Sequence, residues 1–296
     1  MGLLDGLFRG RGINVSVIDH PPCQLGESPL WCEQYNVLYW IDIPVGNIWR
    51  YNLTTQQTSL FWSAGEPVGA VTLNHDRHLI VFAVSGVYLL KEKSGIFTKI
   101  RLFDTNFKEG ERFNDCYTDA YGRVYAGTLQ PNSQQGRMIV YEKNKKQRVL
   151  LENLRVSNGM AVSHDHKYFY HVDSGLGTIT RYQFDINLGQ LVDSNIFFQL
   201  KQNNGSPDGM QMDEEGCLWI ACWNGNKIIR INQQGKLIDT IRLKEVCPTS
   251  VCFGGEDLST IFITTTRYQK YQTKKSGQVL QVKVRVRGLK ANLSRF

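Results

Sequence analysis

The sequence predicts an all-β fold, a six-bladed β-propeller of four-stranded blades whose ring is closed by the N-terminal strand. The first observation behind this prediction is a repeat, because six short hydrophobic segments recur along the 296 residues at intervals of 41 to 49 residues. They begin at Leu38, Leu79, Val124, Phe169, Leu218 and Ile261. Short strands at a period in the mid-forties, separated by turn residues, are typical of a propeller.

The second observation is that each unit holds the same kinds of segment in the same order. An inner strand such as "ESPLW" precedes the hydrophobic strand, and a segment opened by glycine, such as "GNIWRYN", follows it. A fourth, more polar strand such as "QTSLFW" follows in five units, and the sixth unit has no clear one. In a propeller the first strand of each blade lines the central channel.

The third observation is a spare strand, "INVSVID", at residues 13–19. We expect this strand to complete the last blade and close the ring, which removes open sheet edges. On this interpretation residues 13–296 form a single propeller domain and residues 1–12 form an N-terminal extension.

Four polar residues occupy an equivalent place in four of the six units. Glu27, Asn114, Asn158 and Asp208 each lie 10 or 11 residues before the hydrophobic strand of their unit. Because equivalent positions in a closed ring converge on its axis, we expect two carboxylates and two amides to face one another at the mouth of the channel. The alternative is that Asn114, Asn158 and Asp208 only cap the strand entrances, as such residues often do. Glu27 does not fit that alternative.

A ring of this composition favours a bound cation. Two carboxylates at close range repel each other unless a positive charge neutralises them. The available ligand atoms are all oxygen, which suits Ca²⁺, Mg²⁺ or Mn²⁺. Since the protein oxygens are few, such a site leaves room for water or substrate.

Composition and charge argue against several other classes of protein. No apolar run approaches the roughly 18 to 20 residues that span a bilayer, and "MGLLDGLFRGRG" does not match a signal peptide, so we expect a cytoplasmic protein. The net charge is +7, but the basic residues cluster only in "QVKVRVRGLK", where alternation with valine is typical of a strand with one exposed face. The sequence contains no basic stripe with interleaved aromatic residues, the pattern that would indicate nucleic-acid binding. The seven cysteines include no C-x-x-C pair and are expected to be reduced.

Several longer motifs carry a family resemblance. "LGESPLW", "RFNDCYTDAYGRVYAGT", "SNGMAVSHDHKYFYHVDS" and "PDGMQMDEEGCLWIACWNG" follow one another over most of the chain. Together they resemble the regucalcin and gluconolactonase family, which includes the senescence marker protein of animals. The resemblance implies a six-bladed propeller that binds one divalent metal on its axis and hydrolyses sugar lactones.

The resemblance also implies roles for individual residues. Glu27, Asn158 and Asp208 would be the metal ligands, and Asp208 would also be the general base. Asn114 would lie beside the metal and bind substrate or a coordinating water, and Arg112 would hold the substrate.

One departure from the family pattern concerns the loop after the "AGT" strand. Vertebrate members carry a substrate-contacting glutamate there, whereas this loop, "LQPNSQQGRM", contains no acid and has Asn132 nearest that place. The metal site is unaffected by this difference, but the lactone preference is left open.

We therefore expect a divalent-metal-dependent lactonase that converts a sugar (aldono-) lactone such as gluconolactone to the aldonic acid. The expected cofactor is one divalent ion, Ca²⁺ first, with Zn²⁺, Mn²⁺, Mg²⁺ or Fe²⁺ as alternatives. Either Asp208 or a metal-bound hydroxide could serve as the base. The alternative functions are a non-catalytic calcium-binding regulator, a hydrolase of other esters or organophosphates on the same site, and a protein-binding platform. The expected partner is a small sugar lactone. We expect no binding to nucleic acid or to a membrane, and we expect the protein to be a monomer.

Overall fold

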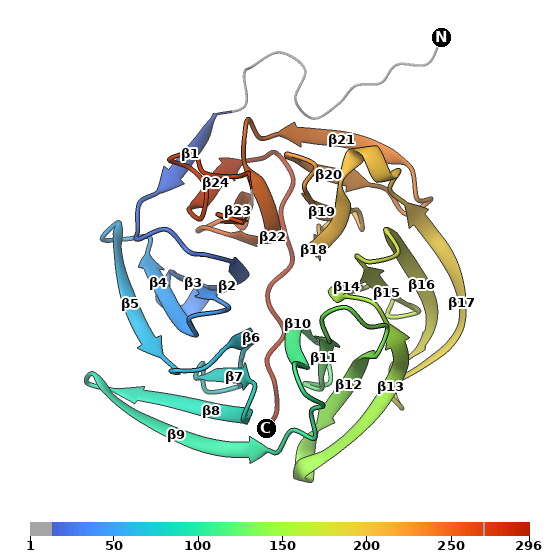
Figure 1. Ribbon diagram of the computed structural model, residues 1–296, viewed down its shortest axis with the longest axis horizontal. Coiled ribbons are helices and arrows are strands. Elements are labelled where there is room, and N and C mark those ends of the chain that lie inside the picture. The colour runs from blue at the N-terminus through green and yellow to red at the C-terminus, as the bar shows by residue number, and fades with distance from the viewer. Residues whose placement is uncertain (1–13, 269) are drawn as a thin grey trace.

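The computed structural model describes residues 14–268 and 270–296, which form six four-stranded blades arranged in a ring (Figure 1). The predicted six-bladed propeller is therefore confirmed, whereas the predicted extension at residues 1–12 lies outside the described residues. The described part of the chain contains no α-helix and only three short 3-10 segments, at Glu33–Tyr35, Lys143–Lys145 and Gln202–Asn204. It contains no helix long and apolar enough to cross a membrane.

Each blade runs in chain order from the axis outwards. Blade 1 comprises β2 (Gly26–Cys32), β3 (Val37–Asp42), β4 (Asn47–Asn52) and β5 (Gln57–Ser63). Blade 2 comprises β6 (Val68–Leu73), β7 (Leu79–Ala83), β8 (Gly86–Lys93) and β9 (Ile96–Phe103). Blade 3 comprises β10 (Arg112–Thr118), β11 (Val124–Leu129), β12 (Gly136–Glu142) and β13 (Lys146–Leu154).

The second half of the ring repeats this arrangement. Blade 4 comprises β14 (Ser157–Val162), β15 (Tyr168–Asp173), β16 (Thr178–Asp185) and β17 (Gln190–Gln199). Blade 5 comprises β18 (Ser206–Met212), β19 (Leu218–Trp223), β20 (Lys227–Ile231) and β21 (Leu237–Arg242). Blade 6 comprises β22 (Cys247–Gly254), β23 (Thr260–Thr266) and β24 (Val279–Lys283), with β1 (Val15–Ile18) as its outer strand.

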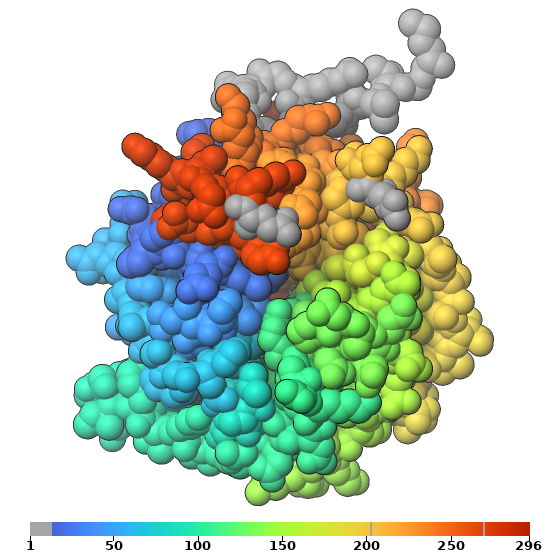
Figure 2. Space-filling model, in the orientation of Figure 1, coloured from blue at the N-terminus to red at the C-terminus, as the bar shows by residue number. Residues whose placement is uncertain are grey.

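The N-terminal strand closes the ring as predicted. β1 pairs antiparallel with β24, with Val15 opposite Val282 and Ile18 opposite Val279. The first and last blades then pack through aromatic side chains, since the rings of Trp31 and Phe262 stack with their centroids 5.6 Å apart. In the space-filling view the blades follow one another around the ring in the order of the chain (Figure 2).

Every inner strand is interrupted near its start by a β-bulge. The pairing with the second strand shifts between Glu27 and Leu30, Val68 and Ala70, Phe113 and Asp115, Asn158 and Met160, Pro207 and Met210, and Pro248 and Ser250. A bulge leaves one residue unpaired, bends the strand and re-aims its side chains. All six blades therefore break the regular alternation at the same end of the channel, which we call the entrance end.

The last ten residues, 287–296, cross the opposite face of the ring, and we call them the strap (Figure 1). Backbone hydrogen bonds of 2.8 to 3.1 Å join the strap to turns or inner strands of four blades, pairing Arg287 with Glu214, Gly288 with Leu258, Ser294 with Leu73, and Arg295 with Gly122. The strap therefore ties the blades together at the end of the channel away from the polar ring.

The start of the strap overlaps the segment "QVKVRVRGLK", residues 281–290, whose alternation predicts a strand with one exposed face. The alternation itself is present, because Val284 and Val286 are buried while Arg285 and Arg287 are exposed. β24 nevertheless ends at Lys283. The strand is shorter than predicted because the chain turns there to follow the opposite face.

Candidate active site

The entrance-end bulges bring the predicted polar residues together. Glu27, Asn158 and Asp208 are each no more than 7% exposed and lie at or beside the bulges of blades 1, 4 and 5. Asn114 is the bulged residue of blade 3, between Phe113 and Asp115. Burial of four polar side chains is costly unless they find partners, so their contacts decide what the site can do.

One chain of hydrogen bonds runs through the residues of two neighbouring blades. Arg112 donates from a guanidinium nitrogen to Asn114 Oδ1 at 2.8 Å. Asn114 Nδ2 then donates to Asn158 Oδ1 at 2.7 Å. Asn158 Nδ2 continues the chain to the hydroxyl of Ser174 at 2.8 Å. The structure thus places Arg112, Asn114 and Asn158 in one connected chain.

The two carboxylates of the ring are held in an unfavourable electrostatic setting. Burial and the neighbouring charges of Asp208 and Asp115 raise the pKa of Glu27 well above its usual range. Burial and Asp115 likewise raise the pKa of Asp208. Arg112 opposes both shifts in pKa, since its positive charge favours the ionised carboxylates. Among the described residues the guanidinium of Arg112 is the positive charge that opposes these shifts, and Asp115 adds a further acid to the site.

Asp115 is the third acid and was not among the predicted site residues. Exclusion from water raises its pKa to about 7, against one backbone hydrogen bond from Cys116 that lowers it. The sequence signal was present, because Asp115 directly follows Asn114, but a turn-forming role fitted the same Asn-Asp pair equally well. Its influence on both Glu27 and Asp208 places it at the same end of the channel.

Two further acids position the strands that carry the site residues. Asp42, at the end of β3, accepts hydrogen bonds from the backbone N–H groups of Gln24 and Leu25 at 3.0 Å. Asp173, at the end of β15, accepts from Arg155 and Val156 at 3.0 and 3.1 Å. Each carboxylate fixes the chain two residues before a site residue, Glu27 in one case and Asn158 in the other.

Blades 2 and 6 have a glycine and a threonine at their bulges in place of an acid or an amide. At the bulge of blade 2 the residue is Gly69, where a Cβ atom would lie only 2.0 Å from the carbonyl oxygen of Phe113. In blade 6 Thr249 turns its hydroxyl to the carbonyl oxygen of Gly26, at 2.6 Å. The four predicted polar residues therefore lie at or beside the bulges of the other four blades.

A hollow of about 480 Å³ lies on the entrance face beside Arg112. It is lined by Pro67, Val84, Thr105, Phe107 and residues 108–112. The acid-free loop at residues 130–135 is bonded to this wall, because the Gln130 side chain donates to the carbonyl oxygen of Glu109 at 2.9 Å and Lys108 donates to the side chain of Gln135. Asn132 is exposed on this loop.

The donor set fits an oxygen-liganded divalent cation. Glu27 and Asp208 supply two buried carboxylates whose pKa values are raised by burial and by neighbouring acids, a setting that a bound cation relieves. Asn158 adds an amide oxygen, so the candidate ligands are all hard oxygen donors. Within the described residues no group of three or more His, Cys, Asp and Glu side chains is arranged to hold a metal ion, so the amide is needed to complete the set.

Comparison with known proteins identifies the family. A family model described as "SMP-30/Gluconolactonase/LRE-like region" matches residues 25–267. The chain belongs to this family. The matched SMP-30/gluconolactonase region contains all five predicted site residues, and the strap lies beyond it.

Individual relatives of the SMP-30/gluconolactonase family are similar over most of the chain. A 6-deoxy-6-sulfogluconolactonase of Pseudomonas putida is 34% identical over 249 residues, which cover 83% of this chain and 84% of the relative. A regucalcin of Pongo abelii is 32% identical over 253 residues, with 83% and 84% covered. The solved structure of a calcium-binding regucalcin from Agrobacterium tumefaciens matches with a TM-score of 0.89 at 20% identity, covering 96% of this chain and 98% of that one. This last likeness bears on the fold alone.

Proposed function

We propose that this protein hydrolyses a sugar (aldono-) lactone to the aldonic acid with the help of one divalent cation held by Glu27, Asn158 and Asp208. The observation that carries the proposal is the pair of buried carboxylates without a matching positive charge at the mouth of the channel. Membership of the SMP-30/gluconolactonase family and the likeness to a sulfogluconolactonase support the choice of a lactone as substrate. Ca²⁺ is the first candidate, with Mg²⁺, Mn²⁺, Zn²⁺ and Fe²⁺ as alternatives.

The chain's own residues divide the remaining work. A divalent cation in this site supplies Lewis acidity toward a carbonyl oxygen. Arg112 borders the hollow of the entrance face and can donate hydrogen bonds to substrate oxygens. Asn114 is held by Arg112 and Asn158, so it keeps a fixed orientation beside the reacting group.

Asp208 is the residue proposed to take the proton from the attacking water. It is buried at the bulge of blade 5, and within the described residues no side chain is recorded as donating a hydrogen bond to its carboxylate. General-base catalysis contributes about 10²- to 10⁴-fold to a rate. Because the same carboxylate is also a proposed ligand, its loss should weaken cation binding and turnover together.

The test is lactone hydrolysis by protein that has been stripped with a chelator. Glucono-, galactono- and xylonolactone are offered as substrates, with Ca²⁺, Mg²⁺, Mn²⁺, Zn²⁺ or Fe²⁺ returned one at a time. Asp208→Ala is assayed beside Asp257→Ala, which removes an exposed aspartate on the opposite face that pairs with Lys283. We expect one cation to restore turnover in the wild type and in Asp257→Ala, and Asp208→Ala to lose at least about 10²-fold.

Other results would favour the alternative functions. Cation binding without turnover of any lactone would contradict the lactonase proposal and favour a calcium-binding role. Turnover of aryl esters or organophosphates in place of lactones would keep the site and replace the substrate class. Full activity in the stripped protein would contradict the role of the cation.

A further inference from the structure

The hydroxyl of Ser174 continues the hydrogen-bond chain of the candidate site beyond Asn158. Ser174 directly follows β15 and accepts a hydrogen bond from Asn158 Nδ2 at 2.8 Å. Its own hydroxyl proton goes to the backbone carbonyl oxygen of Pro207, at 2.5 Å. We propose that Ser174 is a positioning residue, which fixes the amide of Asn158 with its oxygen available to the cation. This inference rests on the proposed function, because it assumes a cation at the axial site.

The chain of hydrogen bonds from Arg112 to Pro207 can run in one direction only. Arg112 at one end has hydrogen-bond donors and no acceptor, and the Pro207 carbonyl at the other end is an acceptor and no donor. Between these two ends each of the side chains of Asn114, Asn158 and Ser174 must accept on one side and donate on the other. If the Asn158 amide were turned over, its NH₂ group would face the Nδ2 donor of Asn114 and its oxygen would face the acceptor of Ser174.

The orientation matters because the two ends of an amide are different. Only the oxygen of an asparagine side chain can bind a hard cation, whereas the NH₂ group repels it. An amide that can rotate freely presents the wrong end part of the time. A hydroxyl whose proton is already committed to Pro207 removes that freedom.

Blade 1 provides an internal comparison. Its ligand candidate, Glu27, has two chemically equal oxygens and needs no such orientation. Asp42 and Asp173 hold equivalent places, since they pair with Gly26 and Ser157, the residues before Glu27 and Asn158. The residue after Asp42 is Ile43, buried in the hydrophobic core, while the residue after Asp173 is Ser174. A hydroxyl is found at this place beside the amide and is absent beside the carboxylate.

The contact with Pro207 gives the same hydroxyl a second effect. Pro207 directly precedes Asp208, so Ser174 joins the blade 4 ligand to the backbone of the blade 5 ligand. A single side chain therefore sets both the rotation of Asn158 and its distance from the strand that carries Asp208. Residues of this kind, which orient metal ligands, typically contribute about 10- to 100-fold to metal affinity.

The experiment measures cation affinity directly, by titration calorimetry of the chelator-stripped protein with Ca²⁺. Ser174→Ala removes the hydroxyl and Ser174→Thr keeps it. Ser163→Ala is the matched control, because Ser163 lies in the same blade at the opposite end and also makes two hydrogen bonds, to Asp165 and from the N–H of Tyr168. Thermal unfolding of each metal-free variant reports its stability.

We expect Ser174→Ala to raise the dissociation constant for Ca²⁺ by about 10- to 100-fold, with Ser174→Thr close to the wild type. Ser163→Ala should lose thermal stability without losing affinity. Equal affinity in Ser174→Ala and wild type would overturn the inference while leaving the proposed function intact. If the wild type itself binds neither Ca²⁺ nor any other ion of the add-back series, the cation of the proposed function fails instead.

Repeating the Ser174 substitution in an Asn158→Asp variant distinguishes an effect on the orientation of the amide from an effect on packing. In Asn158→Asp the ligand has two equal oxygens, so a group that orients an amide has nothing left to do. Ser174→Ala should then change the affinity by less than about threefold, against at least about tenfold with Asn158 present. The ratio of the two effects corresponds to a coupling of at least about 0.7 kcal/mol between the two positions. An undiminished loss in the Asn158→Asp background would show that Ser174 does not act through the amide, and would overturn the inference.

Discussion

The two ends of the axial channel are built from the same six inner strands, but the acids on the axis at the entrance end lack the close ion pairs that buried acids make at the opposite face. At the opposite face Asp119 pairs with Arg123 at 2.7 Å, and Asp213 pairs with Arg230 at 2.6 Å. Asp213 also accepts a hydrogen bond from Trp219 Nε1 at 2.8 Å. At the entrance end Glu27 and Asp208 share the positive charge of Arg112, and Asp115 raises the pKa of both. A satisfied buried acid stabilises the fold, whereas an unsatisfied one is a cost that a ligand can relieve.

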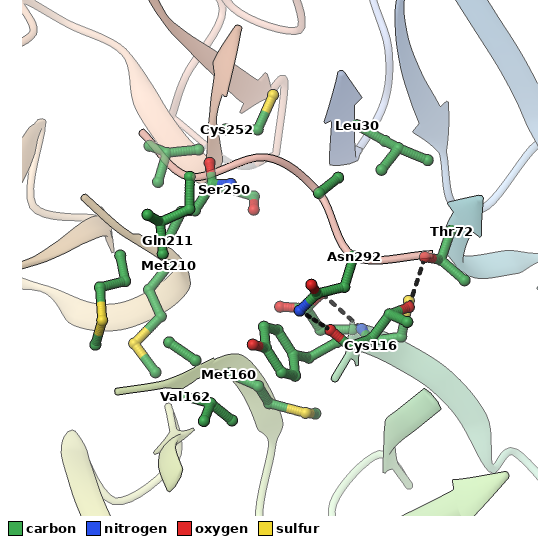
Figure 3. Close-up of a pocket in the computed structure, with 18 of the residues that line it drawn as sticks. Leu30, Thr72, Cys116, Met160, Val162, Met210, Gln211, Ser250, Cys252 and Asn292 are labelled. Atoms are coloured by element: carbon green, nitrogen blue, oxygen red, sulfur yellow. Dashed lines mark hydrogen bonds between the residues drawn. The ribbon is translucent and has the colours of Figure 1, made fainter. Parts of the chain in front are cut away.

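The ends also differ in how they are closed. Between them lies a cavity of about 440 Å³ lined by residues of all six inner strands, including Leu30, Thr72, Cys116, Met160, Met210 and Ser250 (Figure 3). Asn292 of the strap points into this cavity and donates to the carbonyl oxygen of Thr118 at 3.0 Å (Figure 3). The cavity reaches Asp115 but not Glu27, Asn158 or Asp208. The strap therefore covers the end of the cavity away from the predicted site residues and leaves their end facing the entrance.

The comparison predicts opposite results for two Asp→Asn substitutions. Asp213→Asn removes one of the two carboxylates that pair with the buried Arg230 and leaves it with Glu215, at 2.8 Å. Losing one member of a buried pair costs about 3–5 kcal/mol. Asp208→Asn removes one of several mutually repelling acids, so the metal-free protein should be as stable as the wild type or more stable. Urea unfolding of the stripped variants near neutral pH measures both. Destabilisation of similar size in the two variants would show that Asp208 is a structural acid like Asp213.

The same contrast predicts how the metal-free protein responds to pH. The folded-state pKa values of Glu27, Asp208 and Asp115 are raised, the last to about 7. The folded protein therefore holds protons that the unfolded chain releases near pH 4. The stability that these protons contribute is fully present below that pH, and it is lost as the pH rises through the folded-state pKa values. Each tenfold difference in proton affinity between the folded and unfolded states is worth about 1.4 kcal/mol.

Thermal unfolding between about pH 5 and about pH 8 tests this expectation. The melting temperature of the stripped wild type should fall as the pH rises, and saturating Ca²⁺ should remove most of that fall by neutralising the carboxylates. Asp208→Asn should show a shallower pH dependence and no response to Ca²⁺. A melting temperature that is independent of pH in the stripped protein would contradict the electrostatic account of the site.

Much of the fold was predictable because it repeats. Six copies of one strand pattern fix the number of blades, and the spare strand at residues 13–19 could only complete a unit that lacked its fourth strand. The contact between Asn114 and Asn158 was predictable for the same reason, since equivalent positions in a ring meet at its axis, whereas Arg112 was expected at the site only from the family resemblance. The number of residues between each polar residue and the hydrophobic strand that follows it varies by one among Glu27, Asn114, Asn158 and Asp208. This variation was the only trace in the sequence of the bulges that aim these side chains.

Features that do not repeat were not predictable. The role of Ser174 depends on an amide in the same blade and a carbonyl in the next. The strap departs from the repeat altogether, and the alternating valines before it suggested a longer strand. Burial followed the alternation at Val284 and Val286, but the direction of the chain depends on contacts with distant turns.

The strap gives the smallest expected effect and the sharpest test of whether the two ends are independent. A Cβ atom on Gly288 would lie 2.1 Å from Cβ of Phe253, so Gly288→Ala should force the strap away from blade 6. Such overpacking costs about 1–3 kcal/mol. The nearby control is Lys290→Ala, which loses only an exposed ion pair with Glu33 at 2.9 Å and should change stability by less than about 1 kcal/mol.

Affinity for Ca²⁺ should remain at the wild-type value in both strap variants, because the strap ties the opposite end of the channel and the proposed ligands lie at the entrance end. Equilibrium unfolding and calorimetry on the same preparations measure the two quantities separately. If Gly288→Ala weakened Ca²⁺ binding in proportion to its loss of stability, the inner strands would transmit strain along the whole channel. The contrast between a structural end and a functional end would then be wrong, since closure by the strap would also hold the entrance bulges in place.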